Sequence, residues 1–444
     1  MEELEQEINQ PETPQNKPKN VFTNKNFVLA FLGAFVSNTG SILYGFAVSF
    51  YILVLTGNNA LIQGLYLATG GITFMIVVLF GGVISDRFHK GKIMYLCDYA
   101  RGAAIILLTV LLMTVITGNT GKIVALFILA VIGNFIGAIF SPAASSLLPH
   151  IVPEESFQQA QSYYATMNSF QSILGIVLAG ILYSTIPINV LFLIVGCCYL
   201  LSGVSEMFIK YNFVKSEEKL TVRTAFNDIK IAFNYLVGIK PILYLIIAIL
   251  FVNFFFSPVG SNFLPYFIST DVAGSDYLFK DIMEPEMWSS IISVVLSLGS
   301  IIFAIVMSNL KPKEHISKGL GLSFIAVSGT FAALSIFYVL FAKNVININT
   351  LLIAMLVIVF IIGMLLVTIN IPASTKLMSM VDKDKLGKVN SLTDIGSQGL
   401  IPLSNLLGGL VISFLGTSAL LIACTVGFAL TTVFIVFNKY INQL

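Results

Sequence analysis

Charged side chains inside apolar segments are the residues of this sequence whose types and spacing could do chemistry. In KIMYLCDYARG, Asp98 and Arg101 stand three residues apart within a largely apolar and aromatic run. Residues at this spacing lie on one face of a helix, so the two side chains can pair. Burying either charge alone in a membrane would cost about 2.5 kcal/mol or more. The spacing predicts an intramembrane ion pair, and proton handling is the alternative.

Two further acids stand near the ends of apolar runs. Asp394 follows Ser391 by three residues, which is the spacing of a capping box. This pair predicts the N-terminal cap of a helix, with a proton carrier as the alternative. Glu206 precedes Lys210 by four residues, which allows an ion pair at the membrane surface. The cysteines all lie in apolar runs without metal-ligand spacing, so we expect no metal, no cofactor and no redox chemistry.

The segment GGVISDRFHKGKIM, residues 81–94, joins two apolar runs through a short and highly charged turn. Its paired glycines, Gly81 and Gly82, predict close approach of a neighbouring helix. Asp86 stands where the first of the two runs ends, and an acid in that position needs a partner nearby. The basic residues that follow favour the cytoplasmic side of a membrane, and they are Arg87, His89, Lys90 and Lys92.

Long apolar runs must position all of these residues. Apolar residues make up 57% of the 444 residues and charged residues 10%, which excludes a soluble domain of this length. The sequence predicts an all-α polytopic membrane protein with transmembrane helices at 27–55, 61–85, 93–116, 123–147, 158–183, 190–209, 241–267, 287–310, 319–341, 351–375, 392–415 and 418–437. The net charge of +2 gives no indication of nucleic-acid binding.

Polar segments flank and divide these helices. Residues 1–26 have no apolar period and predict a disordered tail, and residues 438–444 form a short C-terminal tail. Residues 210–240 predict a linker that contains an amphipathic helix on the membrane surface. Lysine and arginine concentrate in the loops that follow even-numbered helices, so both termini are expected in the cytoplasm.

An internal repeat relates the two groups of six helices, residues 27–209 and 241–437. FSPAASSLLPHIVPEESFQQAQSYY, from Phe140, aligns with NIPASTKLMSMVDKDKLGKVNSLTD, from Asn370, and each copy ends one helix and starts the next. The alignment pairs proline with proline at Pro142 and Pro372. Two pseudo-symmetric six-helix halves related by an axis along the membrane normal are therefore expected.

The charged turn and the repeat together resemble the major facilitator superfamily. The family pattern Gly-x-x-x-Asp-Arg, followed by basic residues in the loop between helices 2 and 3, is matched by Gly82, Asp86, Arg87, Lys90 and Lys92. The glycine that usually stands two residues past the arginine is displaced to Gly91. The resemblance implies that Asp86 docks on the N-terminus of helix 11 and latches the outward-open state.

The segment 140–162, with its Phe-x-Pro-Ala, Leu-Pro and Val-Pro motifs, resembles the macrolide-efflux and siderophore-exporter branch of this superfamily. Asp98 and Arg101 match the Asp-x-x-Arg that this branch has in helix 3. What the branch implies is export of amphiphilic compounds powered by the proton gradient.

The family architecture implies a substrate cavity between the halves, lined by helices 1, 4, 7 and 10. On the first three of these helices, uncharged polar side chains recur at helical spacing, so each set faces protein or water rather than lipid. The candidate cavity residues are Asn38, Ser41, Tyr44, Asn134, Ser141, Asn253, Ser257, Thr368 and Asn370. For any one of them, a hydrogen bond to a neighbouring helix is the alternative.

An uncharged and aromatic-rich cavity favours an amphiphilic substrate over a sugar phosphate or nucleotide. We expect a monomeric secondary transporter of a bacterial plasma membrane that exports amphiphilic, macrolide-like compounds in exchange for protons. A translocator of lipids or lysolipids with the same fold is the alternative. The sequence does not favour an enzyme or a nucleotide-driven pump, because it contains neither a Gly-x-Ser-x-Gly motif nor a phosphate-binding glycine loop.

Overall fold

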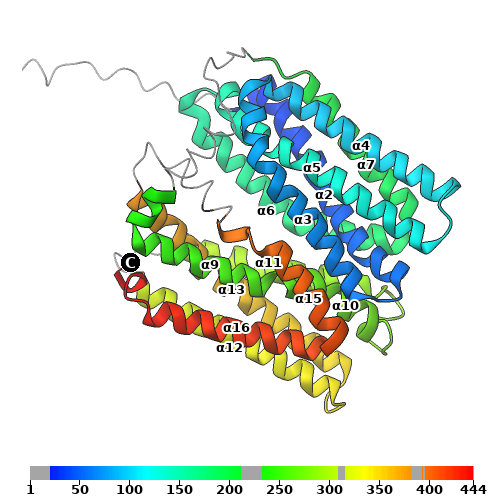
Figure 1. The fold of residues 1–444 in the computed structure, drawn as a ribbon, viewed down its shortest axis with the longest axis vertical. Coiled ribbons are helices and arrows are strands. Elements are labelled where there is room, and N and C mark those ends of the chain that lie inside the picture. The colour runs from blue at the N-terminus through cyan, green and yellow to red at the C-terminus, as the bar shows by residue number, and fades with distance from the viewer. Residues whose placement is uncertain (1–20, 212–232, 309–315, 382–392, 394–395, 444) are drawn as a thin grey trace, which may run out of the picture.

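The computed structural model describes residues 21–211, 233–308, 316–381, 393 and 396–443. Within these ranges, twelve helices are long and apolar enough to span a membrane, and no strand occurs. The all-α, twelve-helix prediction is therefore confirmed. Figure 1 shows the helices as two groups, with the blue-to-green N-terminal half beside the green-to-red C-terminal half.

The N-terminal half consists of α2 (Lys25–Thr56), α3 (Ala60–Arg87), α4 (Lys90–Thr114), α5 (Asn119–Ile151), α6 (Glu154–Thr185) and α7 (Ile188–Met207). The C-terminal half consists of α9 (Lys240–Pro258) with its continuation through α10 (Leu264–Phe267), then α11 (Glu286–Ser308), α12 (Ser317–Ala342), α13 (Ile348–Met380), α15 (Ile401–Leu415) and α16 (Thr417–Phe437). The span that contains α15 begins at Gly396.

Short polar turns end one helix and cap the next. After α2, Gly57 adopts a left-handed conformation with φ 62°, where its lack of a side chain avoids strain, and Asn59 then caps α3 by accepting from the amide of Ile62. The repeat appears as two helices of equal length, since α5 and α13 each span 33 residues and contain Pro142 and Pro372 in their last third.

The expected tails are partly ordered. Val21 is buried, and Asn24 caps α2 by accepting hydrogen bonds from the amides of residues 26 and 27. The end of the predicted disordered segment 1–26 is therefore a packed helix start, because an apolar residue and a capping residue stand there. At the other terminus Ile441 is fully buried and Tyr440 stacks on Tyr244. Most of the predicted amphipathic linker helix lies outside the described residues.

The seventh span, Lys240–Val272, is not a regular α-helix. Two π-helical turns interrupt it, at Val259–Phe263 directly after Pro258 and at Ile268–Val272. Proline lacks an amide hydrogen and disturbs helical hydrogen bonding, and π-turns tend to occur at functional positions in helices. The first π-turn presents the Ser261 carbonyl to the Gln63 side-chain amide of the other half at 3.3 Å.

The two halves contact each other mainly through α3 with α15 and α6 with α11. Glycines make these contacts close, because a methyl group built on Gly409 would lie 3.0 Å from the Cα atom of Gly64. Asn58 adds a hydrogen bond to the Ser269 carbonyl at 3.4 Å. These contacts gather toward the end of the bundle where α2 ends and α3 begins, and Figure 1 shows the halves diverging toward the opposite end. That opposite end carries the charged turn between α3 and α4 and the C-terminus.

Candidate functional site

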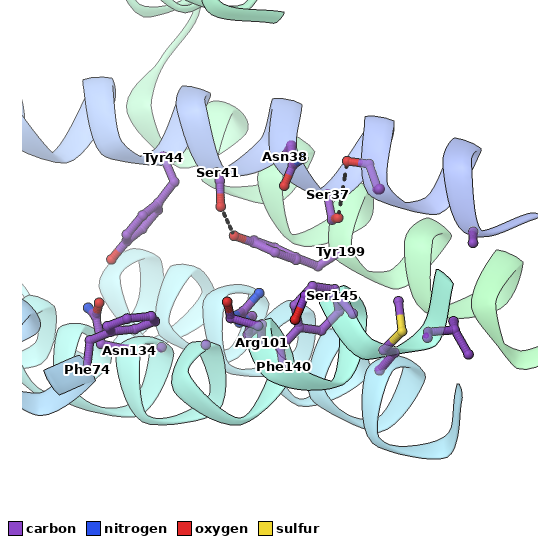
Figure 2. Close-up of a pocket in the computed structure, with 18 of the residues that line it drawn as sticks. Ser37, Asn38, Ser41, Tyr44, Phe74, Arg101, Asn134, Phe140, Ser145 and Tyr199 are labelled. Atoms are coloured by element: carbon purple, nitrogen blue, oxygen red, sulfur yellow. Dashed lines mark hydrogen bonds between the residues drawn. The ribbon is translucent and has the colours of Figure 1, made fainter. Parts of the chain in front are cut away.

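A cavity of about 650 Å³ lies inside the N-terminal half, with walls from α2, α3, α4, α5, α6 and α7. Figure 2 shows side chains of α2 on one side facing those of α4 and α5 on the other. All five candidate residues of the N-terminal half line it, and these are Asn38, Ser41, Tyr44, Asn134 and Ser141. The rings of Phe74, Phe140 and Tyr199 form part of the apolar wall.

Hydrogen bonds fix the orientation of several of these lining groups. The Ser41 hydroxyl lies 2.7 Å from the Tyr199 hydroxyl, and the Tyr44 hydroxyl lies 3.4 Å from that of Tyr66. Asn134 donates to the carbonyl of Ala130 one turn earlier at 2.9 Å. That bond leaves the Asn134 side-chain carbonyl as an acceptor for a ligand.

The candidate residues of the C-terminal half do not line this cavity. Asn253 donates to the Ser397 carbonyl at 2.9 Å, and Ser257 donates to the Asn405 side chain at 2.9 Å. Thr368 donates to the Ser323 hydroxyl at 2.7 Å, while Asn370 is exposed. Asn253, Ser257 and Thr368 therefore each form a hydrogen bond to a neighbouring helical segment, which is how membrane helices satisfy buried polar groups.

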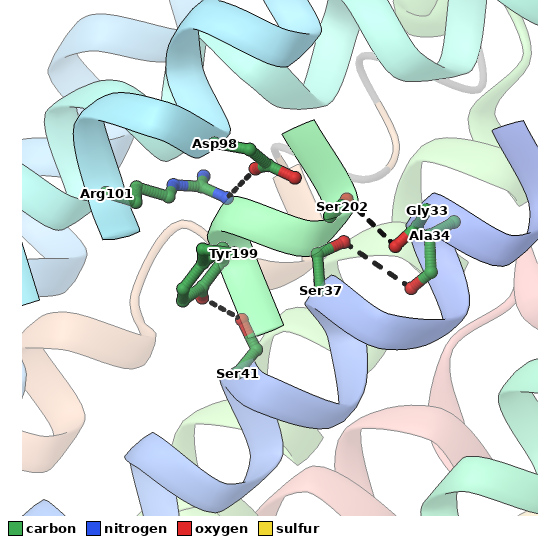
Figure 3. A network of polar contacts seen from close by, with 8 residues as sticks. All are labelled: Gly33, Ala34, Ser37, Ser41, Asp98, Arg101, Tyr199 and Ser202. Atoms are coloured by element: carbon green, nitrogen blue, oxygen red, sulfur yellow. Dashed lines mark hydrogen bonds and ion pairs between the residues drawn. The ribbon is translucent and has the colours of Figure 1, made fainter. Parts of the chain in front are cut away.

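Arg101 also lines the cavity, so the expectation of an uncharged cavity was wrong. Its guanidinium lies 5.0 Å from the centre of the Phe140 ring and 5.6 Å from that of Tyr199, which permits cation–π attraction. One guanidinium nitrogen lies 3.7 Å from an oxygen of Asp98, in the pairing that the three-residue spacing allows. Asp98 is fully buried, whereas the Arg101 side chain keeps 14% of its surface exposed. Figure 3 shows both side chains beside Tyr199 and Ser202 of α7.

The expected surface pair between Glu206 and Lys210 does not form. Glu206 is fully buried, and α7 ends at Met207, so Lys210 lies past the helix with its backbone bonded to the Asn26 side chain. The Glu206 side chain instead packs against α2 at Gly33, where a methyl group built on the glycine would lie 3.1 Å from the Glu206 Cγ atom. The pair fails because a four-residue spacing brings side chains together only where the helix continues through both.

One face of α6 contributes cavity residues that sequence reasoning missed, namely Gln161, Tyr164 and Asn168. These positions are separated by three and four residues, so they form a stripe on one side of the helix. The same polar periodicity that identified α2 and α5 would have found them. The family architecture implies helices 1, 4, 7 and 10 as cavity walls, and α6 is the fifth span of the bundle.

The charged turn between α3 and α4 packs against its neighbours through a glycine and a buried lysine. Gly81 lies against the Ala138 backbone of α5, whereas no neighbouring atom from the described residues lies within 4 Å of a methyl group built on Gly82, so among these residues close approach occurs at Gly81. Lys90 is buried and its ammonium donates to the Ser85 carbonyl at 3.4 Å, while Arg87 and Lys92 are exposed. The Asp86 side chain and the expected helix-11 cap, Ser391 and Asp394, lie outside the described residues.

His89 caps α4 at this turn. Its Nδ1 atom accepts from the amide of Lys92 at 3.3 Å, which requires an unprotonated nitrogen. Partial burial, together with the positive charge of Lys92, lowers the pKa of His89 below its ordinary value. Next to it, the Tyr211 hydroxyl accepts from the Lys90 amide at 2.7 Å and so holds the start of the linker against the turn.

Comparisons with known proteins identify the family. A family profile described as Major Facilitator Superfamily matches residues 30–404. The chain is 26% identical to an uncharacterized MFS-type transporter of Bacillus subtilis (strain 168), YkuC, over 66% of this chain and 67% of that protein. It is 29% identical to macrolide efflux protein A of Streptococcus pyogenes, over 37% of this chain and 39% of that protein.

Solved structures share the fold at low sequence identity. A POT family transporter in complex with a thioalcohol-conjugated peptide superposes with a TM-score of 0.71 at 14% identity, covering 97% of this chain and all of the other. A bacterial homologue of the iron transporter ferroportin in an inward-facing state superposes with a TM-score of 0.66 at 14% identity, covering 93% of this chain and all of the other. The profile spans both halves of the bundle, and the chain therefore belongs to the major facilitator superfamily.

Proposed function

We propose that this transporter exports amphiphilic compounds of the macrolide type in exchange for protons. The observation that carries the proposal is the cavity of about 650 Å³, whose wall combines aromatic rings, uncharged polar groups and the single guanidinium of Arg101. Such a wall suits a large, mostly apolar ligand with few polar groups. The likeness to a macrolide efflux protein over part of the chain supports the same substrate class.

Transport would proceed by alternating access. The halves rock about the glycine contacts between α3 and α15, and the cavity opens at one end of the bundle at a time. With both termini in the cytoplasm, as the loop charges favour, the end at which the halves diverge faces the cytoplasm. The described arrangement then corresponds to an inward-open state, and the latch formed by Asp86 and the start of helix 11 belongs to the opposite state.

Everted membrane vesicles test this function. Radiolabelled erythromycin should accumulate in vesicles that contain the transporter when their interior is acidified, and accumulation should fall to the level of protein-free vesicles when the pH gradient is dissipated. Asn134→Leu, which replaces a polar lining group by an apolar one of similar size, should weaken uptake more than Glu284→Gln on an exposed loop. Equal uptake with and without the transporter would refute macrolide export.

Orientation has a separate test. Single cysteines in place of Lys219 and Lys383 should react with a membrane-impermeant maleimide only from the cytoplasmic side, and one in place of Asp276 only from outside, because lysine-rich loops stay in the cytoplasm. If the cysteine at position 276 were labelled only from the cytoplasmic side, the predicted topology would be wrong.

A further inference from the structure

Two buried acids share one cation beside the cavity. Asp98 on α4 and Glu206 on α7 are both fully buried, and neither carboxylate accepts a hydrogen bond from the described part of the chain. The Ser202 hydroxyl lies close to both carboxylates, but its single hydrogen is directed at the Gly33 carbonyl at 2.9 Å. Figure 3 shows the Asp98 side of this cluster, with Asp98 above Ser202 and the Ser202 hydroxyl bonded to the Gly33 carbonyl of α2.

The charges of this cluster do not balance unless a proton is bound. Arg101 lies 3.7 Å from Asp98 and neutralises one carboxylate. Glu206 lies within electrostatic range of Asp98 and Arg101. It also interacts with Cys97 and Tyr164, and neither of these two side chains carries a positive charge. A second carboxylate that has no cation of its own, and whose neighbouring Ser202 hydroxyl donates elsewhere, is strongly disfavoured in a medium of low polarity.

We propose that Glu206, Asp98 and Arg101 form a proton-binding site that holds one proton, carried in this structure by Glu206. Binding adds H⁺ to the Glu206 carboxylate to give the neutral acid, and release returns the carboxylate. With the proton the three side chains sum to zero charge, and without it they sum to one negative charge. The inference deepens the proposed function, on which it rests for the use of the proton in transport.

The proton site adjoins the cavity wall. Arg101 and Tyr164 line the cavity and also interact electrostatically with Glu206, so a change in the cavity is felt at the buried acid. Gly33 lets α2 close over the site, because a methyl group there would lie 3.4 Å from a Glu206 oxygen. Any movement of α2 relative to α7 therefore changes the surroundings of the proton.

Charge counting gives a direct spectroscopic test. In purified transporter without substrate at neutral pH, the infrared band of protonated carboxyl groups, assigned by its shift in D₂O, should correspond to one buried acid. Glu206→Gln and Asp98→Asn should each reduce it to none, because one acid then remains for one cation. Arg101→Met should raise it to two, because both acids must then be neutral. Glu284→Gln, at an exposed position, is the matched control and should leave it at one.

The outcomes separate this inference from the proposed function. No such band in the parent, or an unchanged band in Glu206→Gln, would overturn the proton site whatever the substrate is. Should Glu206→Gln fail to fold, Glu206→Asp keeps an acid one methylene shorter, and an unshifted band there would equally overturn it. In liposomes, a gradient of one pH unit can drive at most about tenfold accumulation of erythromycin by the parent, and Glu206→Gln should lose this accumulation. The same variant should keep the exchange of labelled for unlabelled erythromycin, which needs no net proton transfer. Failure of the parent to transport erythromycin would refute only the substrate.

Discussion

Removal of the cavity arginine should destabilise the protein far more than removal of the whole ion pair. Arg101→Ala deletes the only cation within 4 Å of the buried Asp98 among the described residues. The acid must then take up a proton or remain as an uncompensated charge. An ordinary carboxyl titrates about three units below pH 7, so protonation there costs about 4 kcal/mol. This agrees with the range of about 3–5 kcal/mol for breaking a buried pair.

The double variant Asp98→Ala, Arg101→Ala avoids this cost of protonating Asp98, because the acid is absent. It loses the same cation–π contacts with Phe140 and Tyr199 as the single variant, and in addition a small volume at position 98. We allow about 1 kcal/mol for that volume, the scale of one buried methylene. The single variant should therefore be less stable than the double variant by about 3 kcal/mol at pH 7, and the difference should nearly vanish at pH 5 because protonation becomes cheaper by about 1.4 kcal/mol per unit.

Unfolding by sodium dodecyl sulfate in mixed micelles, followed by circular dichroism, measures this difference at each pH. Both variants are compared at the same pH, so the titration of other groups cancels. Equal stability of the two variants at pH 7, or a difference that does not shrink toward pH 5, would show that Asp98 does not depend on Arg101.

Three further predictions concern the turn and the contact between the halves. Asp86→Asn should reduce transport by a few-fold to about thirty-fold at normal membrane levels, because a helix N-terminus favours the charged form by up to about 2 kcal/mol; normal transport would exclude the latch. Gly409→Val should press on Gly64 and cost about 1–3 kcal/mol in this state, so spin labels across the contact should report longer distances, and an unchanged distribution would contradict the contact. The pKa of His89 is lowered, so the hydrogen bond by which His89 caps α4 at the Lys92 amide stabilises the fold above about pH 6.5 and is lost as the pH falls through the lowered pKa. His89→Asn can still cap the helix and should lack this loss of stability in acid.

The fold could be predicted from the sequence because apolar runs of membrane-spanning length determine where helices form. All twelve predicted runs overlap the observed spans, and the largest local difference is the seventh, where π-turns interrupt the helix near Pro258. Hydropathy does not distinguish an α-turn from a π-turn, since both bury the same side chains. Helix ends differ from the predicted ones in both directions, since α13 continues to Met380 past the predicted end at residue 375, whereas α7 ends at Met207, two residues before the predicted end.

The candidate site was less predictable because it depends on contacts between helices. Polar spacing along one helix selected Ser41 and Asn134, and both line the cavity of the N-terminal half. The same criterion selected Asn253 and Ser257, whose side chains bond to backbone or side-chain acceptors near α15. Glu206 was misassigned for the same reason. Its surroundings depend on Gly33 of α2, which is far away in sequence and whose lack of a side chain leaves room for the buried acid.

The unequal distribution of buried charge between the halves has an evolutionary consequence. Among the described residues, the buried charged side chains are Lys90, Asp98 and Glu206, all in the N-terminal half. The C-terminal half joins its helices by hydroxyl pairs, such as Ser335 with Thr425 at 2.7 Å. Loss of one such pair costs about 0.6 kcal/mol, whereas loss of one partner of a buried ion pair costs about 3–5 kcal/mol. We therefore expect the C-terminal interior to tolerate substitution more readily, so that sequence variation among homologues concentrates there while the N-terminal interior changes slowly.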